Sequence, residues 1–262
     1  MNTFNTWTQI SYIMKILICL SNVPDTTTKI KFTGDGKTFD STGVQWIINP
    51  WDELALTRAL ELKETSGTTI EKVTVISVGK ADIEPTLRKA LAIGADDAVR
   101  IDAEARDAYQ VAAEIADFVK SQPYDIIFCG IESSDYNGST VGGMLAEFLD
   151  GASVSSVSGL SLENGQVKIS REIDGGQEIL ETSLPVVAVV QKGIAKEPRI
   201  PSMRGIMMAR TKPLTVKPAV ASEALTEFTY FENPPAHAKC RMIDAENVGE
   251  LVEVMKNNLK II

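Results

Sequence analysis

Short apolar runs alternate with helical segments through the first two-thirds of the chain, and this order restricts the fold more than any other feature. Ile16–Leu20 is apolar at every position, which is typical of a strand buried on both faces of a sheet. Pro50 to about Glu64 has helical features, since proline suits a first turn and acidic residues suit the positive helix end. Strands separated by helices imply a parallel sheet with right-handed crossovers. The other predicted strands are Lys72–Val78, Asp97–Ile101 and Ile126–Cys129, and the other predicted helices are Ile83–Ile93, Tyr109–Val119 and Met144–Leu149.

The pattern changes after residue 150. Four further runs are predicted to be strands joined by short turns at Asn164-Gly165 and Gly175-Gly176, and we interpret them as an antiparallel addition to the sheet. These strands are Val154–Leu162, Gln166–Arg171, Glu178–Leu184 and Val186–Gln191. An earlier hairpin is expected where Gly34-Asp35-Gly36 separates Thr28–Phe32 from Thr38–Asp40. The fold class is therefore α/β, with a parallel sheet, an antiparallel addition and a loosely structured end.

The chain is divided into four parts by these patterns. Residues 1–13 are interpreted as an N-terminal extension, because Met14 directly precedes the first strand and is a plausible natural start. Residues 14–192 form the α/β domain, and residues 193–212 form a protruding loop bounded by prolines. Residues 213–262 form an extended arm that ends in a predicted helix, Ala245–Leu259. Either the arm packs on its own domain or it needs a partner's surface, and the length of its structureless stretch favours a partner.

Charge and composition exclude several classes of protein. The net charge is -9, from 26 Lys and Arg against 35 Asp and Glu, so neither nucleic acid nor an anionic membrane is expected as the main partner. The apolar run from Ile13 to Leu20 is short and contains Lys15, which argues against membrane insertion and a signal peptide. A cytoplasmic location is expected.

Cysteine and histidine usage predicts no metal site and no catalytic residue. Cys19, Cys129 and Cys240 are far apart and odd in number, and the first two lie in apolar strand-like runs, so we expect reduced thiols. The single histidine, His237, lies in a proline-rich stretch and is interpreted as a loop residue. A catalytic triad or a histidine-rich metal centre is therefore not expected.

The stretch from Ser133 to Gly143 is the main candidate for binding chemistry. It follows a buried strand and precedes a helix, and it is rich in Gly, Ser, Thr and Asn. At the carboxyl ends of parallel strands, helix N-termini present unpaired N–H groups that suit a phosphate, and glycines allow close approach. Two interpretations remain open: a phosphate site, or a helix start with ordinary capping.

Two further segments have a structural and a functional interpretation. Arg171–Gly176 matches a hairpin turn between two strands, which its pattern alone favours. Glu197–Met208 contains three methionines and two isoleucines between prolines and a glycine. Methionine clusters usually fill a core, but they also occur on surfaces that fit several partners, and the flanking prolines favour a protruding loop here.

Together these segments resemble the electron-transfer flavoprotein beta family, and the resemblance extends from about Met14 to the C-terminus. Its most specific part runs from Arg171-Glu172-Ile173-Asp174-Gly175-Gly176 through Leu184-Pro185 and Glu197-Pro198-Arg199 to Ile206-Met207. Asn49-Pro50, Ala90–Asp96 and the loop before Met144 support it. The resemblance implies a Rossmann-like sheet of the adenine nucleotide alpha hydrolase-like type. It also implies a heterodimer in which FAD lies mainly on the alpha subunit and this chain binds AMP or, in bifurcating members, a second FAD.

The resemblance also implies roles for individual residues. Cys19, Asn49 and Val78 match positions around an adenosine moiety, Trp51 matches an aromatic near the alpha-bound flavin, and Glu172 matches an acid at the subunit and flavin interface. The residues at the phosphate loop are Asp135, Asn137, Gly138, Ser139, Thr140, Val141 and Gly142. Met203 matches the tip of a loop that docks on partner dehydrogenases, with Ile206 and Met207 beside it. The arm would wrap around the alpha subunit.

The implied function is that of an electron carrier, not an enzyme. Acyl-CoA or other flavoprotein dehydrogenases would reduce the flavin, and a quinone reductase or another acceptor would oxidise it. One alternative is a bifurcating protein that oxidises NADH at a second FAD in this chain. Another is a stand-alone nucleotide-binding protein with a similar sheet.

Overall fold

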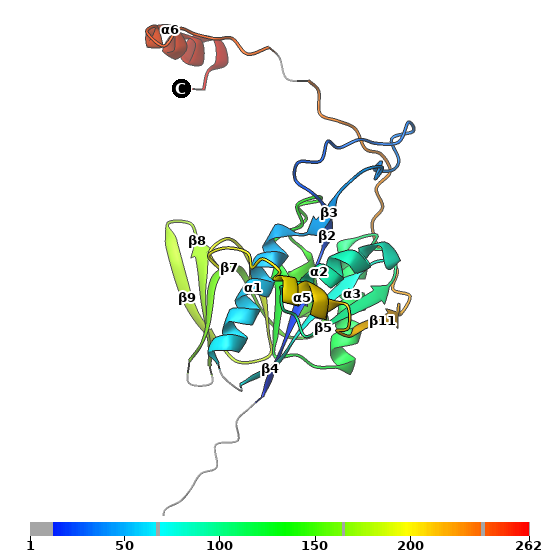
Figure 1. Cartoon of the computed structure of the whole chain (residues 1–262). Helices are drawn as coiled ribbons and strands as arrows, with labels where there is room; N and C mark the ends of the chain where they lie inside the picture. The colour runs from blue at the N-terminus through cyan, green and yellow to red at the C-terminus, as the bar shows by residue number, and fades with distance from the viewer. Residues whose placement is uncertain (1–12, 67–68, 164–165, 237–238, 262) are drawn as a thin grey trace, which may run out of the picture. The chain divides into compact units, whose positions relative to one another are not determined.

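The computed structural model describes residues 13–66, 69–163, 166–236 and 239–261 (Figure 1). By its internal contacts the chain divides into two units. The first consists of the chain up to Ile30 together with Ser41–Thr229, and the second of Lys31–Asp40 together with the chain from Tyr230 onward. His237 and the predicted turn at Asn164-Gly165 lie outside the described residues.

The first unit contains a sheet that, within the described residues, has nine strands in the order β11-β5-β4-β1-β6-β10-β7-β8-β9. Its strands are β1 (Met14–Cys19), β4 (Ile70–Val78), β5 (Asp97–Asp102), β6 (Ile126–Gly130), β7 (Ala152–Glu163), β8 (Gln166–Ile173), β9 (Gly176–Thr182), β10 (Val186–Val190) and β11 (Leu214–Pro218). Neighbouring pairs from β11 to β7 are parallel, while β7 with β8 and β8 with β9 are antiparallel. A short antiparallel pair, β2 (Asn22–Pro24) and β3 (Trp46–Ile48), lies between β1 and the first helix along the chain.

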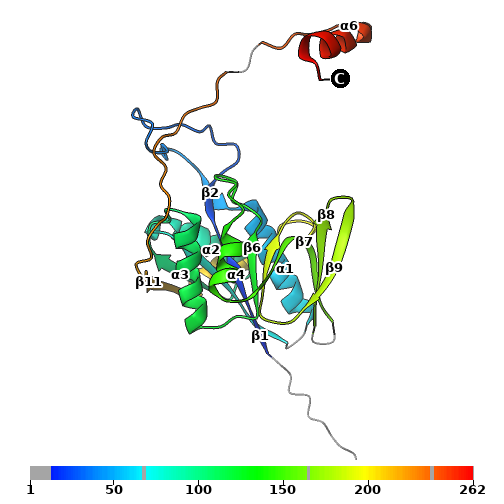
Figure 2. The ribbon, with the colours of Figure 1, turned by 180° about the vertical axis from the view of Figure 1, so that it is seen from behind.

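Helices cover both faces of the sheet. The helices are α1 (Pro50–Thr65), α2 (Glu84–Ile93, preceded by a 3-10 turn at Ala81–Ile83), α3 (Ala108–Ser121), α4 (Val141–Phe148) and α5 (Met203–Ala209) in the first unit, and α6 (Val248–Glu253, continued by a π-helical turn at Val254–Leu259) in the second. On one face, α1 and α2 pack against side chains such as Ile16 and Ile18. On the other face, α3 and α4 pack against residues such as Leu17, and these helices stand in front in Figure 2. Alternate residues of β1 therefore serve two separate cores, which explains its continuous apolar run.

Except for the hairpin around Gly34-Asp35-Gly36, the predicted helices and strands of the first two-thirds are confirmed, with shifts of a few residues at their ends. The prediction for Val186–Gln191 was wrong in one respect, because we assigned it to the antiparallel addition. The structure places β10 inside the parallel part, between β6 and β7, with all five residues buried. A strand without a polar position cannot face solvent on either side, so it belongs in the centre of the sheet. The antiparallel addition is therefore β8 and β9, with their turn at Asp174-Gly175.

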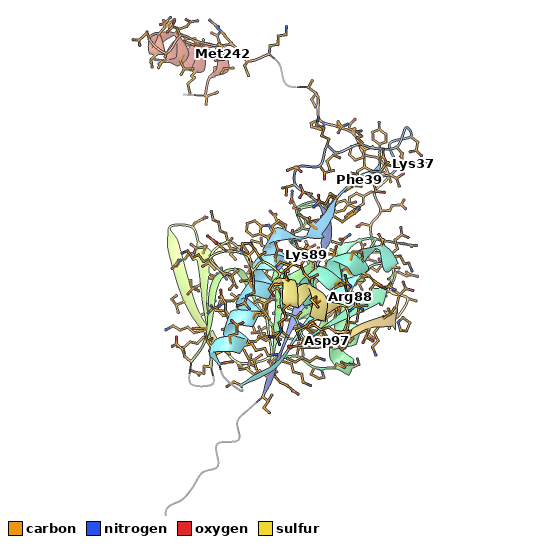
Figure 3. The ribbon with its side chains drawn as sticks, in the orientation of Figure 1. Lys37, Phe39, Arg88, Lys89, Asp97 and Met242 are labelled. Atoms are coloured by element: carbon orange, nitrogen blue, oxygen red, sulfur yellow. The ribbon has the colours of Figure 1, made fainter. Side chains whose placement is uncertain are left out.

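The sheet also extends beyond the boundary that the sequence suggested. Residues 214–218 form β11, which pairs with β5 and was not predicted as a strand. Just before it, α5 lies against α2, where Arg88 Nη1 donates to the carbonyls of Ala209 (2.8 Å) and Lys212 (2.7 Å) (Figure 3). Lys212 Nζ in turn donates to the carbonyl of Ala95 at 2.6 Å. These bonds fix the 193–212 loop and the start of the following segment on the α/β body.

The second unit has little core of its own. The predicted hairpin around Gly34-Asp35-Gly36 is reduced to a single bridge between Phe32 and Phe39. The Phe32 ring stacks on Phe231 with a centroid distance of 5.2 Å. The predicted helix Ala245–Leu259 begins at Val248, capped by Asn247, and none of the residues of α6 is buried. No helix within the described residues combines the length and the apolar character needed to cross a membrane.

Candidate functional site

The order of the parallel strands reverses between β1 and β6. From β1 the chain proceeds to β4 and β5 on one side, and then returns through α3 to β6 on the other side of β1. In open α/β sheets, ligands bind beside the carboxyl ends of the strands at such a reversal. Here the two strands end at Cys19 and Gly130, and we call this region the β1/β6 edge.

A buried carboxylate from the first turn of α1 joins the two strand ends. Asp52, 2% exposed, accepts a hydrogen bond at Oδ2 from the N–H of Ser21 (2.8 Å) and at Oδ1 from the N–H of Gly130 (2.9 Å). Ser21 and Gly130 are far apart in sequence but lie on either side of the strand reversal. Asp52 therefore sets the separation of the two strand ends at the β1/β6 edge.

Asn49, the residue immediately before α1, ties the following loop to the same point. It is 1% exposed; its Nδ2 donates to the carbonyl of Glu132 (2.8 Å), and its Oδ1 accepts from the N–H of Ser134 (3.2 Å). Because both polar atoms of the Asn49 amide are engaged by the loop, the loop after β6 leaves the sheet in a defined direction. The start of α1 thus organises the entrance to the predicted phosphate loop.

Burial at this edge shifts two titratable groups. Loss of solvation raises the pKa of Asp52 to about 7, although the N–H donors of Ser21 and Gly130 act in the opposite direction. A hydrogen bond with Cys129, together with burial, holds the pKa of the Cys19 thiol well above its usual range. Cys19 is therefore a neutral thiol, and it lies with the buried Cys129 in the floor of the site.

The loop itself is exposed and partly left-handed. Asp135–Thr140 are exposed, and both Asn137 and Ser139 have positive φ, 50° and 52°. Helix α4 begins at Val141, three residues before the predicted start at Met144, and the Thr140 side chain does not cap it. The first N–H groups of α4 have no partner within the helix. The arrangement can therefore present backbone donors and the Ser139 and Thr140 hydroxyls to an anion.

Two glycines permit the close packing beneath this loop. A Cβ on Gly130 would lie 2.3 Å from Asp52 Oδ1, and a Cβ on Gly142 would lie 2.5 Å from Val189 Cγ2 and 3.3 Å from Cys129 Cβ. Neighbouring Gly143 has open space around the corresponding position. Gly142 is thus required by the approach of α4 to β10, which brings the amino end of α4 onto the strand ends.

The structure brings most of the sequence-predicted binding residues to one place. Cys19, Asn49, Trp51 and the residues from Asp135 to Gly142 lie on β1, the start of α1, the loop and the start of α4. Val78 ends β4, two residues beyond Ile76, which pairs with Cys19. Val78 therefore lies at the same edge of the sheet on the adjacent strand.

The remaining predicted residues lie elsewhere. Glu172 is on β8, separated from β6 by β10 and β7, and its side chain is exposed. A hydrogen bond from Gln177 Nε2 to Glu172 Oε1 (2.7 Å) lowers the pKa of this carboxyl, so Glu172 is an anion on an open surface. Met203, Ile206 and Met207 lie on α5.

Asp52 was missed as a site residue by the sequence analysis. Its position in the first turn of α1, directly after Asn49-Pro50, was interpreted only as a favourable interaction with the helix dipole. Its near-complete burial is a tertiary property, although an acid so close to a predicted ligand residue was a usable signal. Within the described residues, no group of His, Cys, Asp and Glu side chains is arranged to hold a metal ion.

The fold and this edge define a class: a doubly wound α/β protein with a glycine-containing loop at its strand reversal. A family model described as the electron transfer flavoprotein domain matches residues 36–222. The chain is 34% identical over 253 residues to the electron transfer flavoprotein subunit beta of Syntrophomonas wolfei, which covers 95% of this chain and 98% of that protein. It is also 33% identical to the subunit beta of Bacillus subtilis over 264 residues (95% and 100%) and 31% identical to that of Homo sapiens over 252 residues (93% and 97%). The chain therefore belongs to the electron transfer flavoprotein family, which confirms the resemblance found in the sequence.

Proposed function

We propose that this chain is the beta subunit of a two-chain electron carrier in the cytoplasm. The carrier accepts electrons from acyl-CoA or other flavoprotein dehydrogenases and passes them to a quinone reductase or another acceptor. Family membership supports the general role, and the buried Asp52–Asn49 arrangement at the strand reversal supports a bound nucleotide. No residue of this chain acts as a nucleophile or a general acid in this proposal, because the chain contributes by placing other groups.

We propose AMP as the nucleotide at the β1/β6 edge. Cys19, Asn49 and Val78 would surround the adenosine, while the loop from Asn137 to Gly142 would receive the phosphate. The uncapped start of α4 supports this placement, because it leaves backbone N–H groups available to an anion. The nucleotide would have a structural role, holding the loop against the strand ends.

Denaturation of the purified protein, followed by chromatography of the released nucleotide, tests this proposal. We expect one AMP per chain. Release of FAD from the isolated chain, with no AMP, would replace the proposal by the bifurcating alternative, in which a second flavin accepts hydride from NADH. A chain that binds no adenine nucleotide and no flavoprotein partner would overturn the proposed function.

The alpha-bound FAD supplies the redox chemistry of the carrier when it is present. From this chain we propose two contributors to its surroundings, Trp51 at the start of α1 and the anionic Glu172 on β8. Glu172 is exposed and oriented by Gln177, so it can pair with a cation on the alpha subunit. The second unit supplies further surface for the alpha subunit, because exposed apolar side chains such as Met242 and Leu251 have no core to join there.

Helix α5 is the proposed docking element for the dehydrogenases. Met203 is 77% exposed and Met207 is also exposed, whereas Ala209 anchors the helix in the core. Ile206 lines a crevice between α2 and α5, and its rim includes the cationic side chains of Lys89 and Arg210. A flexible apolar surface with a basic rim suits partners that carry an apolar side chain beside carboxylates.

We expect Met203→Ala to raise the Michaelis constant for the carrier in dehydrogenase-coupled flavin reduction by about 5- to 100-fold, as expected for a buried anchor at an interface. The flavin content of the heterodimer should not change. Val216→Ala, which truncates an exposed apolar residue on β11, serves as the control and should leave the coupling unchanged. Normal coupling in the Met203 variant would remove α5 from the docking surface.

A further inference from the structure

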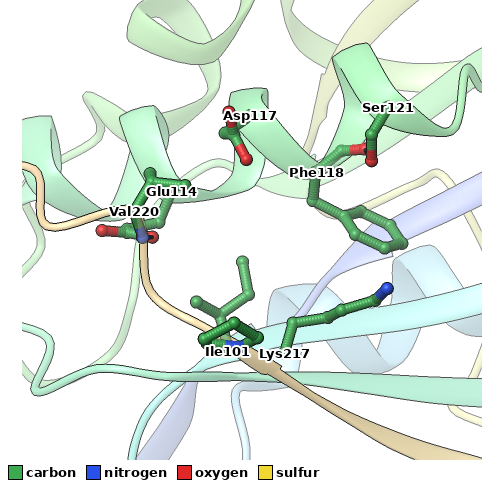
Figure 4. A pocket seen from close by; sticks show the side chains of 8 residues that line it. Ile101, Glu114, Asp117, Phe118, Ser121, Lys217 and Val220 are labelled. Carbon is green, nitrogen blue, oxygen red and sulfur yellow. Dashed lines mark hydrogen bonds between the residues drawn. The ribbon is translucent and has the colours of Figure 1, made fainter.

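The segment that follows β11 is bound to α3 by two carboxylates. We call residues 219–228 the strap. The first carboxylate, Glu114, is 2% exposed and accepts hydrogen bonds from the N–H of Val220 (2.9 Å) and from the Ser222 hydroxyl (2.7 Å) and N–H (3.3 Å). Glu114 and Val220 lie side by side at one end of a crevice between α3 and β11 (Figure 4). The strap therefore begins at a fixed position.

The second carboxylate lies two turns earlier at the start of α3. Asp107 caps this helix, since its Oδ1 accepts from the N–H of Gln110 at 2.8 Å. Its Oδ2 accepts from the N–H groups of Leu225 (2.6 Å) and Thr226 (2.8 Å). One side chain thus caps α3 and holds the strap, so the strap runs along α3 toward its amino end.

At its far end the strap meets the phosphate loop. The Phe228 ring stacks on the Tyr136 ring with a centroid distance of 4.7 Å and an interplanar angle of 24°. Tyr136 lies between Asp135 and Asn137, immediately before the two left-handed residues of the loop. The exposed tip of the loop, which Asn49 does not reach, therefore has a packing partner on the strap.

We infer that Phe228 is a positioning residue for the phosphate loop. Asp107 and Glu114 hold the strap, and the strap in turn holds the Phe228 ring against the loop. The loop is then fixed from two sides, by Asn49 where it leaves the sheet and by Phe228 at its tip. The root of the C-terminal arm is consequently part of the nucleotide site. This inference rests on the proposed function for the nucleotide, but the loop's order can be tested without any ligand.

Hydrogen exchange of the full chain, freed of nucleotide, provides the first test. In Phe228→Ala, the backbone amides of residues 133–139 should exchange faster by up to about tenfold, since a stacked aromatic pair has a stabilising effect of that size. Asp107→Ser should also speed the exchange of these amides, because serine can still cap α3 but lacks the second oxygen that accepts hydrogen bonds from the strap. Leu225→Ala is the matched control within the strap, since that side chain is 65% exposed. Unchanged exchange in the Phe228 variant would overturn the inference.

The dissociation constant for AMP provides the second test. Phe228→Ala should weaken binding by about 3- to 10-fold, and Phe228→Tyr should restore it. The double variant Tyr136→Ala/Phe228→Ala should bind AMP no more weakly than either single variant, because removing one ring already removes the stacking contact that both rings make. Additive losses would overturn the inference. A wild-type chain that binds no AMP would overturn the proposed ligand, while the exchange result would still decide the role of Phe228.

Discussion

Gly142→Ala is expected to lower the free energy of unfolding by about 1–3 kcal/mol, the cost of inserting a methyl group into a packed interior. The new Cβ would lie 2.5 Å from Val189 Cγ2 and 3.3 Å from Cys129 Cβ, so α4 must move away from β10. That movement displaces the start of α4, and binding of the proposed nucleotide, AMP, should weaken with it. Urea unfolding and AMP titration of the full chain measure the two effects.

The adjacent glycine provides the control for this experiment. Gly143→Ala meets no atom within 4 Å, and alanine is favoured over glycine inside a helix, so we expect a gain of up to about 1 kcal/mol. Equal effects at positions 142 and 143 would contradict the close approach of α4 to β10. Loss of AMP binding in the Gly143 variant would mean that the loop, and not the packing of α4, controls affinity.

Asp52→Asn is expected to destabilise the chain by about 1–3 kcal/mol at pH 5, because an amide cannot accept at both positions that face backbone N–H groups. The cost should then shrink as the pH is raised. The folded-state pKa of Asp52, about 7, is above the ordinary aspartate value of 3.8, so the native wild-type chain binds a proton more tightly than the unfolded chain. The contribution of Asp52 to stability is therefore greatest below pH 3.8 and is lost as the pH rises to about 7.

Between pH 5 and pH 8 the difference in unfolding free energy between the two proteins should fall by about 2 kcal/mol. The measurement is a series of urea titrations of wild type and variant at fixed ionic strength, since groups other than Asp52 cancel in the difference. A constant offset across this range would show that Asp52 titrates near its ordinary value and that its environment is wetter than the structure indicates. An increasing offset would contradict the burial of this carboxyl.

The phosphate loop shows which parts of a site can be predicted from sequence. Its composition and its position between a strand and a helix predicted a binding segment at Ser133–Gly143, because glycine, small hydroxyl residues and strand–helix order are local properties, whereas residues 135–142 were assigned within it by the resemblance to a family. Asn49 and Trp51 were assigned to the site only through the resemblance to a family, and not from local sequence features. It did not identify Asp52, whose bonds to Ser21 and Gly130 span 31 and 78 residues.

Sheet position was predictable only where the apolar pattern was considered strand by strand. Residues 186–190 are apolar throughout, which in retrospect places β10 in the centre, but short connections to its neighbours suggested an antiparallel edge. β11 had no such signal, because Leu214–Pro218 is short, partly exposed and ends in proline. Its place beside β5 depends on pairing with a strand more than one hundred residues earlier.

The amino-acid sequence by itself determined the alternating α/β order and the family, and it predicted the loop that we propose for a phosphate, since periodicity and local turn chemistry require no knowledge of distant residues. Only the tertiary structure decided that Asp52 bridges the two strand ends, that β10 is central, and that Phe228 lies on Tyr136. Each of these depends on which distant segments are brought together, and burial and hydrogen bonding between such segments arise only when the sheet has assembled.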